Sequence, residues 1–320
     1  MQNFLDPAIL FFVFGIVAGT LRSNLEIPPQ IARFLSLYLL MALGLKGGFA
    51  LAKSGLTAEV AVSLACALLL ATVVPAMGYA LLVRRLSRFD AAAVAATYGS
   101  VSAVTFITAV QYLETQHTAY GGHMAAAMAL MESPAIVMAV VLANMARRRE
   151  GAPGADVQHG IGKVLHESFT DGAHLLLLGA MGVGLVTGEA GQKAMQPFSG
   201  DLFKGMLAFF LLDMGIVAAR NFGSLKGQSP WLLAYAIGGP LVHAALAFAL
   251  AAAAGLSVGN ATLLMVLAAS ASYIAVPAVV RVAIPEANPS LYFGMSLGLT
   301  FPFNILVGIP LYASVAQRLA

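Results

Sequence analysis

Two short stretches carry hydroxyl side chains inside long apolar segments of this 320-residue chain. One reads TYGSVSAVT (97–105) and the other SASYIAVP (270–277). Gly99 and Pro277 would weaken the helices at these points. An interrupted helix can bind a small ion, because its free N–H groups suit an anion while its free carbonyl and hydroxyl oxygens suit a cation. The two stretches therefore predict a pair of interrupted membrane helices that cross near the membrane midplane.

The residues of these stretches are the candidates for binding an ion where the two helices cross. The expected anion-binding residues are Gly99, Ser100, Val101, Ser102, Ala103, Thr105, Ser270, Ser272, Tyr273 and Ile274. The candidates for a coupling cation carry side-chain oxygens, and they are Ser102, Thr105, Ser270, Ser272 and Glu132. The alternative is a proline-kinked helix whose serines bond to their own backbone, which a single break would favour but a symmetric pair does not.

The composition is that of a protein embedded in a membrane. Hydrophobic residues make up 60% of the chain and charged residues 10%, with a mean hydropathy of +0.86. Soluble globular chains carry about 25% charged residues. The single cysteine, Cys66, excludes a disulfide framework within the chain. The net charge of +3 lies in short loops, which indicates membrane topology rather than a nucleic-acid partner.

Apolar segments of membrane-spanning length alternate with charged or turn-rich breaks. Ten spans are predicted, near residues 7–21, 31–45, 57–83, 90–113, 119–146, 166–187, 201–219, 229–254, 259–283 and 290–318. With both termini outside, the inner loops hold twelve of the 17 Lys and Arg residues, which is the bias typical of cytoplasmic loops. We therefore expect both termini to lie in the periplasm.

The two halves of the chain show weak internal similarity. Residues 6–19 align with 171–184, residues 39–48 with 210–219, and residues 95–104 with 268–277. A repeat of five spans is odd in number, so the second copy must enter the membrane from the opposite side. We expect a first inverted repeat over 1–146, a cytoplasmic connector over 147–165 and a second inverted repeat over 166–320.

The sequence resembles the sodium-dependent bicarbonate transporters of the SbtA type over nearly its whole length. The resemblance is densest in IPPQIARFLSLYLLMALGLKGGFAL, YGSVSAVT, MESPAIVMAVVLANMARR and AASASYIAVPAVVRVAIPEANPSLYFGMSLG. It implies an all-α carrier of ten helices in the bacterial inner membrane, with core and gate domains each drawn from both repeats. It also implies a homotrimer, an elevator mechanism and uptake of bicarbonate with sodium, without a cofactor beyond that ion. We expect a PII-like regulatory partner to be absent or weakly bound, because the central connector is short.

The chain departs from the family pattern at the second interruption. That pattern reads Ser-Ser-Ser-Asp-Ile-Ser-Gly-Pro-Pro, whereas Tyr273, Ala275 and Val276 stand here in place of its Asp, its last Ser and its Gly. In the first repeat, Ala103 and Val104 replace a Gly-Ser pair. These changes remove a charged ligand and narrow the site. The alternatives are therefore a carrier for another small anion or short carboxylate, coupled to protons or sodium, and a binding sensor with a degraded transport site.

Ionisable residues inside the membrane are functional candidates by default. Glu132 precedes Pro134 and is expected either to couple transport or to make a structural hydrogen bond. Lys46 and Asp213, on the second spans of the two halves, are expected to form a structural salt bridge. His174 and His243 are interpreted as packed residues, because no Cys or carboxylate lies at metal-binding spacing near them. No motif of a hydrolytic enzyme is present, so neither an enzyme nor a metal other than sodium is expected.

Overall fold

The computed structural model describes residues 6–149, 172–225 and 227–319, and in these ranges it is helical without strands. Seven helical stretches there are long and apolar enough to cross a membrane. One of them, Gly172–Leu225, contains two long helices, while two further apolar helices, Pro7–Thr20 and Val258–Ala269, are shorter. The all-helical membrane class is confirmed, and the count of ten spans stays a prediction. Most of the expected connector, Asp171 and the start of the sixth span lie outside the described residues.

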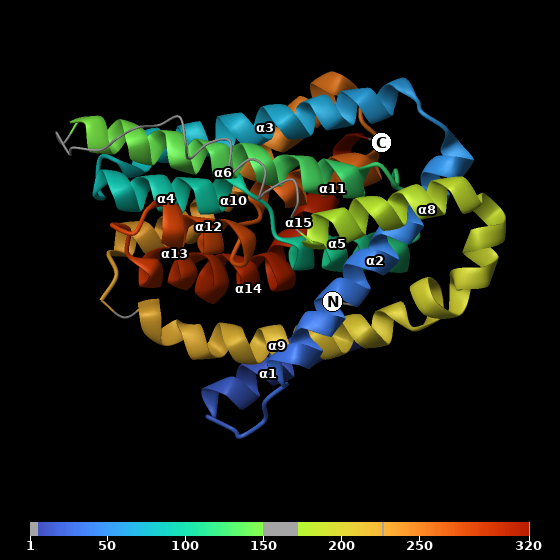
Figure 1. Ribbon diagram of the computed structural model, residues 1–320, viewed down its shortest axis with the longest axis horizontal. Coiled ribbons are helices and arrows are strands. Elements are labelled where there is room, and N and C mark those ends of the chain that lie inside the picture. Colours follow the sequence, from blue (N-terminus) through green and yellow to red (C-terminus); the bar gives the residue numbers. More distant parts are fainter. Residues whose placement is uncertain (1–5, 150–171, 226, 320) are drawn as a thin grey trace.

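Within each described range the helices follow one another along the chain (Figure 1). The first half contains α1 (Pro7–Thr20), α2 (Pro29–Ser54), α3 (Ala58–Leu82), α4 (Arg88–Gly99), α5 (Ala103–Thr115) and α6 (Met124–Arg149). The second half contains α8 (Gly172–Met195), α9 (Phe203–Asn221), α10 (Pro230–Ala254), α11 (Val258–Ala269) and α12 (Ala275–Ala283), followed by α13 (Pro289–Met295), α14 (Phe301–Phe303) and α15 (Ile309–Ala316). Pro302 and Pro310 lie in this last stretch, where two π-helical turns connect α13, α14 and α15.

Capping residues and glycines set several helix ends. Asp6 precedes α1 and accepts a hydrogen bond from the backbone N–H of Ala8 at 2.8 Å. Gly55 ends α2 with a φ of 71°, a backbone conformation that favours glycine. α8 bends at Gly188, whose φ is 53° and ψ is −137°, so its helical path continues past the expected end at residue 187.

Small residues let two helix pairs touch backbone to backbone. Figure 1 shows α1 beside α9, and α2 packs along α8. In the first pair, a Cβ added at Gly19 would lie 2.8 Å from the Cβ of Ala219. In the second pair, a Cβ added at Gly44 would lie 2.9 Å from the Cβ of Ala180. No side chain fits between either pair, so these four helices form one closely packed unit.

Two loop contacts tie the ends of the half-helices to the opposite half of the chain. The backbone N–H of Asn288 donates to Asp90 Oδ1 at 2.8 Å, near the start of α4. The backbone N–H of Gly121 donates to Asn260 Oδ1 at 2.7 Å, near the start of α11. Each contact joins the loop after one interrupted helix to the start of the other interrupted helix. These contacts fix the position of one interrupted helix relative to the other.

Candidate functional site

The two interrupted helices cross at their breaks. α4 ends at Gly99 and α5 begins at Ala103, while α11 ends at Ala269 and α12 begins at Ala275. The backbone N–H of Ser102 donates to Ser270 Oγ at 3.0 Å, and the backbone N–H of Ser272 donates to the carbonyl of Thr97 at 2.8 Å. The extended residues of each break therefore supply hydrogen-bond partners that a continuous helix would have supplied itself.

The residues named as helix breakers act in different ways. Gly99 is the last residue of α4, and a Cβ there would collide with the ring of Pro75 on α3. Pro277 does not interrupt a helix, because the second break runs over residues 270–274 and Pro277 lies in the first turn of α12. A first-turn N–H has no partner in the helix, so proline is tolerated there.

Serine hydroxyls cap the half-helices that follow each break. Ser102 Oγ accepts a hydrogen bond from the backbone N–H of Thr105 at 3.2 Å, and Thr105 Oγ1 lies 2.9 Å from the same oxygen. Ser272 Oγ accepts from the backbone N–H of Val276 at 3.3 Å. Both caps sit at positive ends of helix dipoles, which is where an anion is stabilised.

Buried polar groups complete the hydrogen bonding at the other ends of the breaks. Ser270 Oγ donates to the carbonyl of Leu267 at 2.9 Å, and Asn304 Nδ2 donates to the carbonyl of Ala269 at 2.8 Å. Ser100 is 1% exposed, and its hydroxyl has no hydrogen-bond partner among the described residues. The carbonyls of Leu267 and Ala269 near the end of α11 are therefore satisfied within the protein.

A cavity of about 240 Å³ lies beside the crossing. Its walls come from both breaks and from α2, α6 and α8, and its lining residues are Ser36, Leu40, Val101, Ser102, Ala103, Val104, Met128, Glu132, Ala173, His174, Leu177, Ser272, Tyr273 and Ile274. Six expected anion-binding residues are therefore on its wall, and four (Gly99, Ser100, Thr105 and Ser270) are behind it. Ala103 and Val104 occupy the first turn of α5, so their N–H groups have no acceptor within the helix.

Glu132 and His174 form an ion pair in the wall of this cavity. Glu132 Oε2 lies 2.5 Å from His174 Nε2, and their side chains are 11% and 14% exposed. Glu132 is on α6 and His174 is in the first turn of α8. The interpretation of His174 as a merely packed residue missed this contact, because the two residues belong to different halves of the chain.

Tyr273 fills the position of the acidic residue in the family pattern. It is 7% exposed, its ring packs against Phe301 with 5.1 Å between centroids, and its hydroxyl lies 3.9 Å from Met214 Sδ on α9. The side chain therefore lines the cavity as an aromatic wall between the second break and α9.

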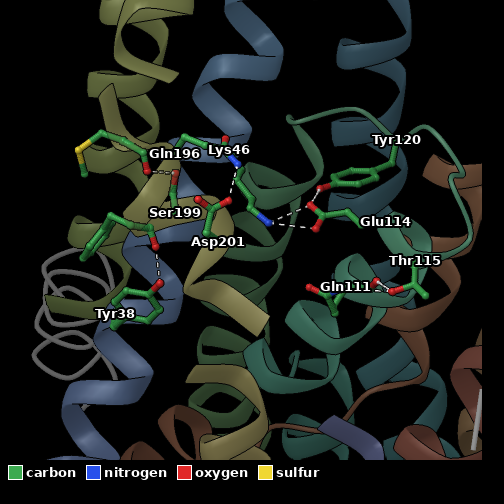
Figure 2. A network of polar contacts seen from close by, with 11 residues as sticks. Tyr38, Lys46, Gln111, Glu114, Thr115, Tyr120, Gln196, Ser199 and Asp201 are labelled. Carbon is green, nitrogen blue, oxygen red and sulfur yellow. Dashed lines mark hydrogen bonds and ion pairs between the residues drawn. The ribbon is translucent and has the colours of Figure 1, made fainter. Parts of the chain in front are cut away.

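The expected pair of Lys46 and Asp213 is replaced by another. Lys46 Nζ lies 3.0 Å from both carboxylate oxygens of Glu114, and Tyr120 donates to the same carboxylate at 3.0 Å (Figure 2). Lys46 also lies 4.0 Å above the ring of Phe203 at the start of α9. Asp213 is ten residues farther along that helix, about 15 Å away along its axis, which is beyond the reach of a lysine side chain. Asp213 is 7% exposed and forms no ion pair with another described residue.

A second polar cavity surrounds Lys46. It has a volume of about 490 Å³, and its lining residues are Lys46, Phe49, Ala50, Lys53, Glu114, Tyr120, Gln192, Gln196, Ser199, Gly200 and Asp201. Gln196 Nε2 donates to Asp201 Oδ1 at 3.0 Å at its edge (Figure 2). Two lysines face two carboxylates there, so the cavity has no excess of either charge.

His243 is 1% exposed, lies in α10 and does not line the cavity beside the crossing. Among the described residues, no group of three or more His, Cys, Asp or Glu side chains could hold a metal ion. The polar groups at the crossing are therefore hydroxyls, backbone groups and one His–Glu pair, a set that can bind a small ion reversibly.

Comparison with known proteins supports one assignment. A search of curated proteins gave no match. A family model for the Na⁺-dependent bicarbonate transporter superfamily matches residues 7–317, which include both interrupted helices and nearly all of the described chain. That superfamily is one of transporters and not of enzymes. The chain belongs to the Na⁺-dependent bicarbonate transporter superfamily.

Proposed function

We propose that this protein is a secondary carrier that moves bicarbonate into a bacterial cell together with sodium. The observation that carries the proposal is the crossing of two interrupted helices beside a cavity that both breaks line, in a chain of this family. The N-terminal ends of α5 and α12 stabilise the anion, and the N–H groups of Ala103 and Val104 donate to it. The hydroxyls of Ser102, Thr105, Ser270 and Ser272 supply the oxygens that a sodium ion requires.

We also propose that the chain consists of two inverted repeats, with residues 1–146 and 166–320 as the copies. The packing of the helices supports this, because exchanging the two copies exchanges the α1–α9 pair with the α8–α2 pair. The same exchange replaces Gly15 by Ala180 and Gly215 by Gly44. Gly15 is in close contact with Gly215, and Ala180 is likewise in close contact with Gly44. A two-fold relation of this kind is the arrangement that lets a carrier open alternately to either side.

The proposed assembly and movement follow from the family. The carrier is a homotrimer in the bacterial inner membrane with both termini in the periplasm. Its core, which contains the interrupted helices, moves against a gate formed largely by α1, α2, α8 and α9. Exposed apolar side chains on α1, including Phe11 and Phe14, support a role for this helix at a lipid or subunit surface.

A second candidate substrate is favoured by Tyr273. An aromatic wall replaces a carboxylate at that point and makes the cavity less polar, which suits an anion with an apolar part such as a short carboxylate. Both substrates use the same binding groups, so the two proposals differ only in the occupant of the cavity.

Uptake into proteoliposomes tests the proposal. Purified protein is reconstituted, and accumulation of radiolabelled bicarbonate is measured with a sodium gradient and with an equal potassium gradient. Acetate, formate and nitrate are measured in parallel. We expect sodium to raise bicarbonate uptake severalfold over empty vesicles. Uptake of a short carboxylate alone would support the second substrate, and uptake of none of these anions would contradict the carrier assignment.

A further inference from the structure

One ion pair lies inside the proposed anion-binding cavity, and its two members differ in how they respond to pH. Among the described lining residues, Glu132, His174 and Tyr273 are the side chains that can change charge. The hydroxyl of Tyr273 faces Met214 at 3.9 Å and ordinarily stays neutral up to about pH 10. The remaining polar lining side chains on α2 and in the two breaks are the neutral serines Ser36, Ser102 and Ser272. Of these three kinds of side chain, only the imidazole of a histidine ordinarily gains or loses a proton near neutral pH.

The charge of Glu132 opposes the binding of an anion unless it is neutralised. A carboxylate in the wall of a cavity within a protein repels a bound anion more strongly than it would in water. A protonated imidazole 2.5 Å from that carboxylate cancels the repulsion. When the imidazole loses its proton, the pair changes from no net charge to one negative charge.

We propose that His174 is a specificity residue whose proton admits an anion to the cavity. With the proton on, the His174–Glu132 pair is neutral and an anion of the bicarbonate or short-carboxylate class binds. With the proton off, the proton passes from the imidazole to water, the charge of Glu132 is exposed and the anion is released. This inference rests on the proposed function, because it concerns the same cavity and the same cargo.

The position of the pair fits this role. Glu132 is on α6, next to the interrupted helices, whereas His174 is on α8, which packs against α2. The pair therefore joins the elements that carry the binding groups to the elements proposed to form the gate. The proton that admits the anion also stabilises the contact that closes the cavity on this side.

Linkage fixes the direction of the pH dependence. If binding requires one proton on His174, anion affinity is highest at low pH, and it falls by about tenfold per pH unit once most of the imidazole is neutral. A permanent cation at this position would abolish that fall. Removing the carboxylate would leave no negative charge to be exposed, so the affinity would fall less as the pH rises.

Binding to the purified full-length protein tests the inference. The dissociation constant of bicarbonate is measured by calorimetry in sealed cells at pH 6.5, 7.0, 7.5, 8.0 and 8.5, with the bicarbonate ion itself held at the same concentration series at every pH. Acetate, which stays ionised over this range, serves as a second probe. The variants are His174→Gln, His174→Arg and Glu132→Gln, and the control is His117→Asn, an exposed histidine outside the cavity.

We expect at least a tenfold loss of affinity across this range for the wild type and for His117→Asn. His174→Gln should bind weakly at every pH, His174→Arg should keep the low-pH affinity up to pH 8.5, and Glu132→Gln should lose less affinity by pH 8.5 than the wild type. A wild-type pH profile in His174→Gln would overturn this inference while leaving the carrier assignment intact. The expected binding profiles without sodium-stimulated uptake would contradict the carrier assignment alone. Absence of binding for both probes at every pH would overturn both.

Discussion

Ser102 and Ser272 serve the crossing in two ways at once. Each hydroxyl caps a half-helix by accepting from a first-turn N–H, at 3.2 Å and 3.3 Å respectively. Each residue also lines the cavity. A hydroxyl that accepts from the backbone can still donate its own hydrogen, so an anion can receive a hydrogen bond without the cap being lost.

Replacing either serine should weaken the binding of the anion. Ser102→Ala and Ser272→Ala each remove one donor, and we expect about ten- to a hundredfold lower affinity, equivalent to roughly 1.5–3 kcal/mol for a charge-assisted hydrogen bond. Loss of the cap should lower helix stability by about 1 kcal/mol. Calorimetry measures the affinity, and size-exclusion chromatography checks that assembly is unchanged. Ser54→Ala, at an exposed position at the end of α2, is the control. Unchanged affinity in both serine variants would place the anion elsewhere.

Tyr273 separates the two candidate substrates. In Tyr273→Asp a carboxylate returns to the position that is acidic in the family pattern, so we expect sodium-stimulated bicarbonate uptake to rise because the sodium ion gains a charged ligand. Tyr273→Phe keeps the packing against Phe301 and should leave uptake unchanged. Proteoliposome uptake measures both. A folded Tyr273→Asp protein without any rise would favour the short carboxylate as the natural cargo.

At the scale of helices, glycine contacts fix how the closely packed unit is built. Gly184 and Gly182 are both on α8, but only Gly184 faces α2, where a Cβ would lie 2.6 Å from the carbonyl oxygen of Leu45. At Gly182 nothing lies within 4 Å of an added Cβ. The two positions therefore differ in packing while sharing a helix.

This difference gives a matched pair of variants. Gly184→Ala should destabilise the protein by about 1–3 kcal/mol, because the helices must separate to admit the methyl group. Gly182→Ala should leave stability unchanged or raise it by up to about 1 kcal/mol, since alanine favours the helix. Thermal unfolding in detergent measures both. Equal melting temperatures for the two variants would contradict the backbone-to-backbone packing of α2 and α8.

The interruptions could be predicted from the sequence because glycine and serine clusters inside apolar segments are local signals. The residues at which each interruption begins and ends could not be predicted, because they depend on contacts with other helices. The first break begins after Gly99, where Pro75 of another helix leaves no room for a side chain. The second begins at Ser270, and Pro277 falls within the following helix. The bend at Gly188 also needed the structure, because other glycines of α8 stay helical.

Charge pairs across the whole molecule were the least predictable feature. Glu132 and His174 come from different halves, and Lys46 pairs with Glu114 rather than with Asp213. Nothing local in the sequence indicates which ionisable side chains will meet, because the partners are set by helix packing. Two residues of the segment IPEANPS also make contacts set by the fold: Glu286 pairs with Arg147 at 2.8 Å and Asn288 caps α13.

The Arg147–Glu286 pair should make the stability of the whole molecule depend on pH. Its hydrogen bond to Arg147 lowers the pKa of Glu286 below its ordinary value. The contribution to stability is therefore present above the ordinary carboxyl range and is lost as the pH falls through the lowered pKa. We expect Glu286→Gln to melt at a lower temperature than the wild type at pH 7, and this difference should shrink as the pH falls below the ordinary carboxyl range.

Thermal unfolding at several pH values measures this difference. Glu189→Gln is the control, because Glu189 and its partner Lys193 are 80% and 77% exposed and such pairs contribute little. A melting difference for Glu286→Gln that persists unchanged at low pH would show that the carboxylate charge has no part in it.

The glycine contacts bear on how fast a carrier of this design can work. Helices that touch through their backbones cannot slide gradually, because a shift of one residue, about 1.5 Å, brings a side chain into the contact. In the proposed carrier, α1, α2, α8 and α9 therefore stay together, and the motion falls at the boundary where His174 meets Glu132 and Lys46 meets Glu114. Both ion pairs must open in each stroke, so they raise the activation barrier. Turnover should accordingly quicken in Glu114→Gln, which removes one of these pairs, even where the affinity for the anion is unchanged.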